Sequence, residues 1–239
     1  MSSLKVPPGS TFGNRLLTAL PRQEYARLSP HLELVRLVPG KILYDAADTV
    51  RHAYFPKAGM ICLLSMTESG RTIEVAMIGN EGMAGIPIIL RSAAAPYQVM
   101  VQLAGNAMRI RADALREEFN RGGHLQDLLL RYTHSVLVQI AQSAACNGFH
   151  TVEERLCRWL LVCRDRVQSD TIYLTQEFLS HMLGVPRTTV TMVASAVQKK
   201  GVIEYSRGKI TIVDRRALEA ASCECYRLVR KGLADFLVA

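Results

Sequence analysis

The sequence lacks the features that would place it in a membrane, on a secretory route or in a disulfide-linked fold. No run of about 18 apolar residues occurs, so no segment is predicted to span a bilayer. Residues 1–13 are polar and contain no apolar core of a secretory signal, so we expect a cytoplasmic protein. The six cysteines form no C-x-x-C pair, and Cys223 and Cys225 are the one close pair. On a single helix their side chains would point about 200° apart, so we predict no metal site.

Motifs of the common enzyme classes are also missing. The chain contains no G-x-S-x-G, no P-loop and no H-E-x-x-H sequence. Its six histidines are scattered, whereas a catalytic β-barrel of the cupin type needs clustered histidine and glutamate ligands. We therefore predict that the protein is not an enzyme and has no catalytic residues and no resident cofactor. The sequence leaves open whether it binds a small-molecule effector, whose identity is unknown.

Positive charge is present and is concentrated in one short segment. The net charge is +8, and 49% of the residues are hydrophobic, which is enough to bury a core. Residues 186–216 contain two acidic side chains and seven basic ones, Arg187, Lys199, Lys200, Arg207, Lys209, Arg215 and Arg216. Charge alone leaves two interpretations equally open: a surface that binds a polyanion, or an ordinary solvated face.

Short strand-like segments separated by turns fill the N-terminal half. Examples are LELVRLV at 32–38, GMICLLSM and RTIEVAMI on either side of Thr67–Gly70, and YQVMVQLA at 97–104 followed by a predicted turn at Gly105-Asn106. This pattern predicts a jelly-roll-type β-roll, a sensor domain, over residues 20–120. We expect residues 1–19 to form a flexible tail.

A long helix is predicted over residues 121–148. Side chains recur along it at alternating spacings of four and three, which is a heptad seam. The seam favours self-association through a partner helix, and the alternative is packing on the chain's own domain. Its predicted dimer contacts are Leu125, Leu129, Tyr132, Val136, Gln139 and Ser143.

Residues 149–213 carry the pattern of a winged helix-turn-helix. Thr151 and Glu154 form a capping box before an apolar helix, and Thr175 is an N-cap for a short helix that ends at Gly184. Pro186 can open a second helix, whose apolar positions Val190, Val193, Ala194 and Val197 should face inward. A β-hairpin with its tip at Ser206–Gly208 follows as the wing.

The outward face of the second helix has the chemistry to read duplex DNA. An arginine can form two hydrogen bonds to guanine, and hydroxyl and thioether side chains can meet other base edges. The predicted base-reading residues are Arg187, Thr188, Thr191 and Met192. The predicted phosphate contacts are Thr175, Gln176, Thr189, Lys199, Arg207 and Lys209.

The order of parts and two motifs resemble the Crp/Fnr superfamily of bacterial transcription regulators. The strongest matches are HTVEERLCRWLL and LTQEFLSHMLGVPRTTVTMV, with GNEGMAGIPIIL weaker. The resemblance implies an α+β protein with a cyclic-nucleotide-binding-like β-roll, a dimerisation helix (121–148) and a winged helix-turn-helix (149–213). It implies a homodimer on a near-palindromic double-stranded DNA site, with RNA polymerase as a further partner. Thr188 and Met192 replace the family's common glutamate and arginine, so only a guanine opposite Arg187 is predicted.

The resemblance also suggests where an effector would bind. Members that bind cyclic nucleotides use a glutamate for the ribose and, ten residues later, an arginine and a hydroxyl residue for the phosphate. The candidate pocket residues are Glu81, Gly82, Met83, Arg91 and Ser92. Aligning the glycines instead places Met83 and Ala93 at the ligand positions, so cyclic AMP is not the expected effector.

Two points stay open in the sequence. Residues 214–239 are predicted as a C-terminal helical extension, for which packing on the domain is favoured over a separate function. The alternative function is an effector-sensing module that acts through protein–protein contact and not through DNA.

Overall fold

A computed structural model describes residues 13–92 and 94–238. These residues form two units: the chain up to Cys62 with Met77–His134, and Leu63–Ala76 with the chain from Ser135 onward. The hairpin segment Leu63–Ala76 therefore contacts mainly the C-terminal unit. No helix in the described part of the chain has the length and apolar character that a membrane crossing needs.

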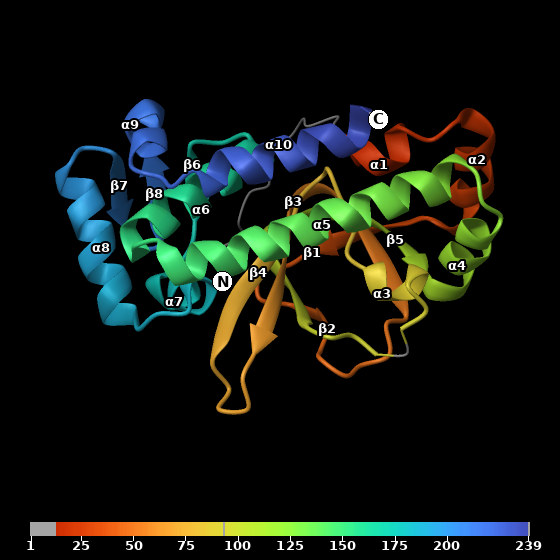
Figure 1. The fold of residues 1–239 in the computed structure, drawn as a ribbon, viewed down its shortest axis with the longest axis horizontal. Helices are drawn as coiled ribbons and strands as arrows, with labels where there is room; N and C mark the ends of the chain where they lie inside the picture. Colours follow the sequence, from red (N-terminus) through yellow and green to blue (C-terminus); the bar gives the residue numbers. More distant parts are fainter. Residues whose placement is uncertain (1–12, 93, 239) are drawn as a thin grey trace. The chain divides into compact units, whose positions relative to one another are not determined.

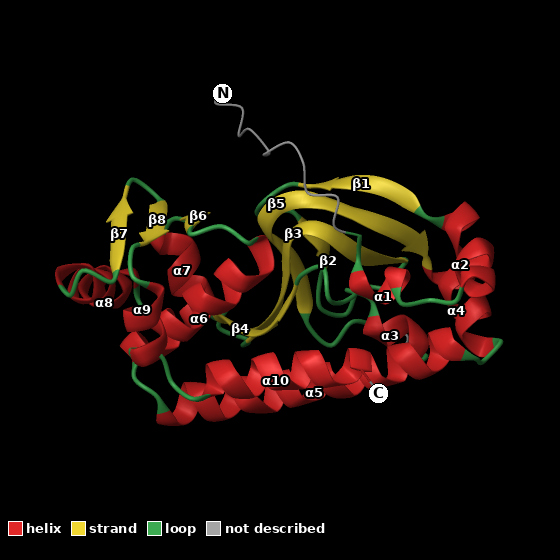
Figure 2. Ribbon diagram, turned by 90° about the horizontal axis from the view of Figure 1, so that it is seen from above, coloured by secondary structure: helices red, strands yellow, loops and turns green. Residues whose placement is uncertain are grey.

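A five-stranded antiparallel sheet organises the N-terminal half (Figures 1 and 2). Its strand order is β1-β5-β3-β4, and β2 pairs with β5. Short helices flank these strands. The strands are β1 (Glu33–Leu37), β2 (Ile42–Tyr44), β3 (His52–Met66), β4 (Thr72–Ile78) and β5 (Gln98–Arg111). The helices are α1 (Arg15–Thr18), α2 (Arg22–Leu28), the 3-10 helix η1 (Ser29–His31), α3 (Ile86–Ile89) and α4 (Ala112–Asn120).

Strand β5 runs without a break through Gly105 and Asn106, so the turn predicted there is wrong. A Cβ atom added to Gly105 would lie 2.0 Å from the carbonyl oxygen of Ala58, and one added to Gly59 would lie 2.6 Å from that of Ala104. The two glycines thus allow the backbones of β3 and β5 to approach closely. Glycine marks a close approach at this position and not a change of direction.

Residues 13–19 are folded, which corrects the predicted flexible tail of residues 1–19; residues 1–12 lie outside the described part of the chain. The buried Asn14 side chain caps helix α1 by accepting from the N–H groups of Leu16 and Leu17. Its amide nitrogen donates to the carbonyl oxygens of Pro56 and Gly82, at 3.0 and 2.8 Å. One side chain therefore satisfies four backbone groups in the N-terminal unit.

Replacing Asn14 with alanine is expected to lower the free energy of unfolding by about 2–4 kcal/mol, because it removes a helix cap and leaves buried carbonyl groups without donors. Thr18→Ala is the matched control, because Thr18 lies on the same helix, is exposed and bonds only the nearby carbonyl of Arg15. Urea unfolding of both variants measures the difference. Equal unfolding free energies for the two variants would show that Asn14 does not hold the N-terminus in place.

The C-terminal half is mainly helical and begins within the long helix α5 (His124–Phe149), which occupies the range predicted for a long helix. Glu24 caps the start of α5 by accepting from the N–H groups of His124 and Leu125. The remaining elements are α6 (Val152–Val167), β6 (Thr171–Tyr173), α7 (Gln176–Leu183), α8 (Arg187–Lys199), β7 (Ile203–Ser206), β8 (Lys209–Ile212), α9 (Arg215–Ala220) and α10 (Cys225–Val238).

Helix α6 is the core of the C-terminal unit. The predicted capping box is confirmed, since Thr151 and Glu154 bond each other's backbone groups. Trp159 is buried, and its indole N–H donates to Glu74 of strand β4 at 3.0 Å. The C-terminal extension, predicted as one helix, is two helices. Asp214 caps α9, and the chain turns before α10 begins at Cys225.

Candidate nucleic-acid interface

Helix α7 and the turn after it place helix α8 on the surface. The Thr175 hydroxyl accepts from the N–H group of Phe178 at 3.1 Å and starts α7. Gly184 ends α7 in the left-handed conformation, with φ of +63°. A Cβ atom there would lie 2.8 Å from Ile73 Cδ1, so the turn requires glycine for both its conformation and its packing.

Helix α8 has one buried and one exposed face, as predicted. Its buried residues are Val190, Ala194 and Val197. The predicted base-reading residues Arg187, Thr188, Thr191 and Met192 are all exposed, and Met192 has 66% of its surface in contact with solvent. The first turn of α8 holds no acidic side chain, and its N-cap residue Pro186 makes no side-chain cap hydrogen bond, so no negative charge offsets the positive end of the helix beside Arg187.

Thr191 and Gln176 also contact each other. The Thr191 hydroxyl lies 2.9 Å from Gln176 Oε1 and 3.0 Å from the carbonyl oxygen of Arg187, and it can donate to either. This bond ties the start of α7 to the middle of α8. Thr191 therefore has a role in fixing the two helices that the sequence did not indicate.

The wing is a three-stranded sheet with the order β6-β8-β7. Ser206 and Lys209 pair across a two-residue loop in which Arg207 and Gly208 both have positive φ, +49° and +75°. Arg207 and Lys209 are exposed on either side of this tip. Near the tip, the half-buried Tyr205 of β7 donates its hydroxyl hydrogen to the carbonyl oxygen of Leu174. Burial raises the pKa of Tyr205, and the nearby Arg187 guanidinium opposes that rise.

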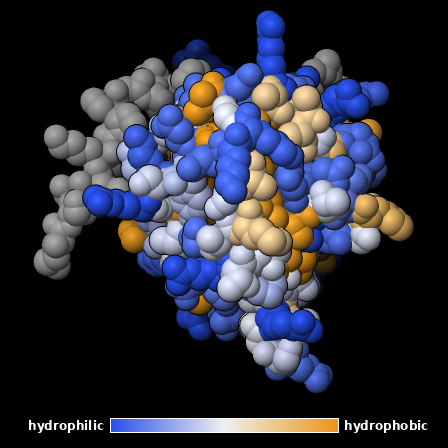
Figure 3. All heavy atoms as spheres, turned by 90° about the vertical axis from the view of Figure 1, so that its left-hand side faces the viewer, coloured by the Kyte–Doolittle hydropathy of each residue, from blue (hydrophilic) through white to orange (hydrophobic). Residues whose placement is uncertain are grey.

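The basic side chains of this region divide into two groups. Lys200 pairs with Glu153, and Arg215 pairs with Asp165, so both are used within the unit. The exposed residues Arg187, Lys199, Arg207 and Lys209 make no such pair with a described acidic side chain. The face of the molecule on the side where α8 lies is largely hydrophilic, with apolar atoms in smaller patches (Figure 3).

Two domain models match this chain in the order of its parts. The cyclic nucleotide-binding domain matches residues 34–121, and the Crp-like helix-turn-helix domain matches residues 154–221, which together cover more than half of the chain. The chain belongs to the Crp/Fnr superfamily. It is therefore a transcription regulator of the Crp/Fnr type and not an enzyme, as predicted.

Individual relatives of this Crp/Fnr protein are distant. The global nitrogen regulator of a Nostoc species is 21% identical over an alignment of 182 residues. The alignment covers 72% of this chain and 81% of that one. A Crp/Fnr family regulator from Eubacterium rectale superposes with a TM-score of 0.67 at 18% identity, covering 86% of this chain and 96% of that one. FixK2 from Bradyrhizobium japonicum superposes with a TM-score of 0.66 at 14% identity. The match covers 80% of this chain and 98% of FixK2. These structures share the fold, which confirms the predicted fold class.

The predicted dimer seam of this Crp/Fnr chain is buried within the chain itself. Leu125, Leu129, Tyr132, Val136, Gln139 and Ser143 are all buried. Tyr132 donates to the carbonyl oxygen of Met83 at 2.9 Å. The assignment of these residues to a partner helix is therefore wrong, and packing on the chain's own domains is correct for this face. A second row at the same spacing, Leu130, His134, Leu137, Ala141 and Ala144, is exposed.

The predicted effector residues do not form an open binding site. Met83 is fully buried, and a Cβ atom on Gly82 would lie 2.5 Å from the Tyr132 hydroxyl. The buried Glu81 carboxylate accepts from the N–H group of Gly79 at 3.0 Å. Arg91 is exposed and donates to Asn120, and the exposed Ser92 hydroxyl donates to the carbonyl oxygen of Ala94. These side chains are therefore engaged in separate contacts within the chain.

A cavity of about 570 Å³ lies elsewhere in the N-terminal unit. None of the predicted effector residues lines it. Its lining includes Asp48, Arg51 and His52, together with Tyr44, whose buried hydroxyl has no hydrogen-bond partner among the described residues. Burial and the nearby Arg109 and Arg111 lower the pKa of His52.

The sequence also missed a cluster of four metal-ligand side chains, Cys146, His150, Cys223 and Cys225, hereafter the Cys3His cluster. The sequence prediction of no metal site places Cys223 and Cys225 on one helix, but α10 begins at Cys225 and Cys223 precedes it. The two side chains are therefore not held about 200° apart, and both reach the cluster. Cys146 and His150 stand four residues apart, a spacing that could have suggested a shared face at the end of the long helix.

Proposed function

We propose that this Crp/Fnr regulator is a cytoplasmic homodimer that binds a near-palindromic DNA operator and controls transcription there by contact with RNA polymerase. The observation that supports it best is the exposed face of α8, where Arg187, Thr188 and Met192 point away from the buried apolar row. In the proposed complex this face enters the major groove. Two copies would bind half-sites about 34 Å apart, one turn of the duplex.

The proposed contacts divide into two kinds. Arg187 reads a guanine through two hydrogen bonds, and Thr188 and Met192 contact neighbouring base edges. Thr175, Gln176, Thr189, Lys199, Arg207 and Lys209 bind phosphates and set the register of the protein on the duplex. Thr191 supports this surface through its hydrogen bond to Gln176, and its exposed side chain contacts a base edge beside Arg187.

We further propose that cyclic AMP is not the effector. The buried Met83, the Tyr132 hydroxyl that bonds its carbonyl oxygen, and the separate contacts of Glu81 and Arg91 support this view. Any small-molecule effector would bind elsewhere in the N-terminal unit.

Selection of genomic DNA fragments with the purified full-length protein tests the proposal. The selected fragments are expected to share a near-palindrome with a guanine at the same position of each half-site. Affinity is expected to fall steeply with salt, because phosphate neutralisation releases counterions, and to be unchanged by added cyclic AMP. Unrelated fragments and salt-independent binding would instead favour a module that acts through protein contact.

A further inference from the structure

The Cys3His cluster is assembled from segments far apart in the sequence. Cys146 and His150 lie at the end of α5, and Cys223 and Cys225 lie between α9 and the start of α10. Each residue offers one ligand atom, and these four atoms all lie within 4.8 Å of one another. All four residues belong to the C-terminal unit, where α10 runs alongside the end of α5 (Figures 1 and 2).

Two distances within the cluster are close to the edges of a tetrahedron around a zinc ion. Cys146 Sγ lies 3.5 Å from Cys223 Sγ, and Cys225 Sγ lies 3.6 Å from His150 Nδ1. Zinc–sulfur and zinc–nitrogen bonds of about 2.3 and 2.1 Å place neighbouring ligand atoms about 3.8 and 3.6 Å apart. A disulfide needs a sulfur–sulfur distance of about 2.05 Å, so Cys146 and Cys223 are not disulfide-bonded at this separation.

The surroundings of the cluster also fit a closed metal site. The three cysteines are buried, and the His150 side chain is only 16% exposed. The second ring nitrogen of His150, Nε2, lies 3.3 Å from the Glu224 carboxylate, which is the arrangement that orients histidine ligands of zinc. The Gln142 amide donates to Cys225 Sγ at 3.0 Å, as a hydrogen-bond donor to a thiolate would.

Two buried arginines on α6 supply the charge that such a site needs. Arg155 and Arg158 are each only 7% exposed, and the Nε atom of each has no hydrogen-bond partner among the described residues. Both interact electrostatically with Cys146. Three thiolates and one Zn²⁺ carry a net charge of −1, so a zinc-bound cluster would give these buried guanidinium groups an anionic partner, and they form no ion pair with a described carboxylate.

We propose that Cys146, His150, Cys223 and Cys225 bind one structural Zn²⁺ in tetrahedral geometry and thereby fasten the C-terminal helices to the end of α5. All four coordination positions come from the protein, so the site holds structure and does not activate water. When Zn²⁺ binds, the three cysteine thiols release their protons to solvent, and each thiolate sulfur bonds to the metal. This function goes beyond DNA recognition and assigns a role to the C-terminal extension.

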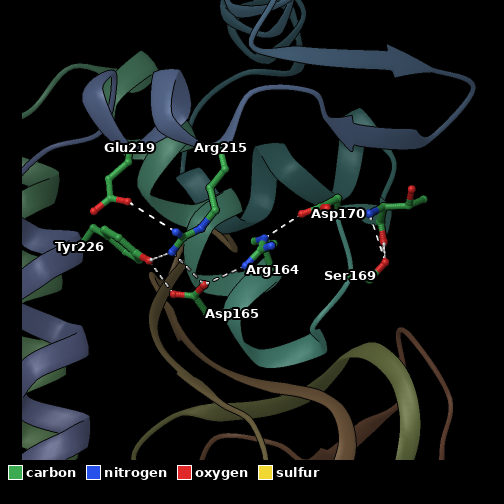
Figure 4. Close-up of polar contacts among 8 residues, drawn as sticks. Arg164, Asp165, Ser169, Asp170, Arg215, Glu219 and Tyr226 are labelled. Atoms are coloured by element: carbon green, nitrogen blue, oxygen red, sulfur yellow. Dashed lines mark hydrogen bonds and ion pairs between the residues drawn. The ribbon is translucent and has the colours of Figure 1, made fainter. Parts of the chain in front are cut away.

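A second set of contacts holds α9 and α10 on α6 (Figure 4). The buried Tyr226 hydroxyl donates to Asp165 at 2.6 Å, and Arg215 bonds both of these side chains. Because this polar network remains when zinc is removed, a metal-free protein is expected to keep its fold while losing stability. The zinc site is therefore open to reversible tests on the intact chain.

Metal analysis of the full-length protein, purified under reducing conditions, tests the proposal. One zinc per chain is expected, and Co²⁺ added to the metal-stripped protein should give the intense visible bands of tetrahedral cobalt and the charge-transfer bands of thiolate ligands. Cys225→Ala should lose at least nine-tenths of the bound metal. Cys157→Ala, which changes a buried cysteine outside the cluster, should retain it.

A milder variant keeps the test decisive if Cys225→Ala does not fold. Glu224→Gln leaves all four ligands in place and weakens the partner of His150, so zinc affinity should fall by about 10–100-fold while the stoichiometry at saturating zinc stays at one. Metal-stripped wild-type protein should melt at a lower temperature, and ZnCl₂ should restore its melting temperature.

Three results would overturn the proposal. The first is wild-type protein that binds neither zinc nor cobalt at saturating metal. The second is an iron–sulfur chromophore with iron in place of zinc. The third is a Cys146–Cys223 disulfide in freshly reduced, metal-free protein. None of these measurements involves DNA, so their failure would be separate from a failure of the proposed operator binding.

Discussion

Leu137→Glu is expected to convert the proposed dimer to a monomer and to weaken operator binding by about 10²–10⁴-fold, because two linked half-site contacts become one. Leu137 is 60% exposed in the middle of α5. It belongs to the exposed row Leu130, His134, Leu137, Ala141 and Ala144, whose alternating spacing of four and three suits a partner helix. A carboxylate at the centre of that contact would be buried without a partner.

Leu34→Glu is the matched control for Leu137→Glu. Leu34 lies on strand β1 and is also 60% exposed, so the substitution makes the same chemical change at the same degree of exposure. Sedimentation measures the oligomeric state, and fluorescence anisotropy with a labelled operator measures affinity. A Leu137→Glu protein that remains dimeric and binds like the Leu34→Glu protein would show that the exposed row of α5 is not the dimer contact.

Arg187→Ala is expected to weaken binding to the selected operator by about 1–3 kcal/mol and to remove the preference for one base. The reason is geometric: Arg187 is the first residue of α8, is exposed, and makes no ion pair with a described acidic residue. Loss of its guanidinium should therefore remove two hydrogen bonds to guanine. Competition binding against operators with each base at that position measures the change.

Lys199→Ala separates base reading from charge. Lys199 is exposed at the other end of α8, where it is proposed to bind a phosphate. Its loss should weaken binding equally on all sequences and reduce the slope of log affinity against log salt by about one. If Arg187→Ala behaves in the same way, Arg187 is a phosphate contact, and the predicted operator guanine has no basis.

Local sequence patterns determined much of the DNA-binding region. The cap at Thr175 and the left-handed conformation at Gly184 depend on backbone groups within about one or two helical turns, so local chemistry determines them. The capping box at Thr151 and the cap at Asp214 follow the same rule. The apolar spacing of α8 indicated which face would be buried, although the burial itself comes from packing on other elements.

The heptad periodicity of α5 predicted a row of side chains that packs against another element. It could not show which of the two rows at this spacing faces a partner helix. Helix α5 carries two rows at the same spacing, and the more conspicuous one is buried within the chain. Tyr132 shows why: its hydroxyl reaches Met83, almost fifty positions earlier in the chain. A pattern within one helix contains no information about what that helix packs against.

By itself, the sequence determined the order of the parts, the helix boundaries set by capping residues and glycine, and the exposed chemistry of α8. Only the tertiary structure decided which face of α5 is buried, that Gly59 and Gly105 lie at a close approach of two strands, and that four metal-ligand side chains meet. The physical reason is distance along the chain. Caps and turns satisfy backbone groups a few residues away, whereas Cys146 and Cys223 meet only after the C-terminal helices have packed against α5 and α6.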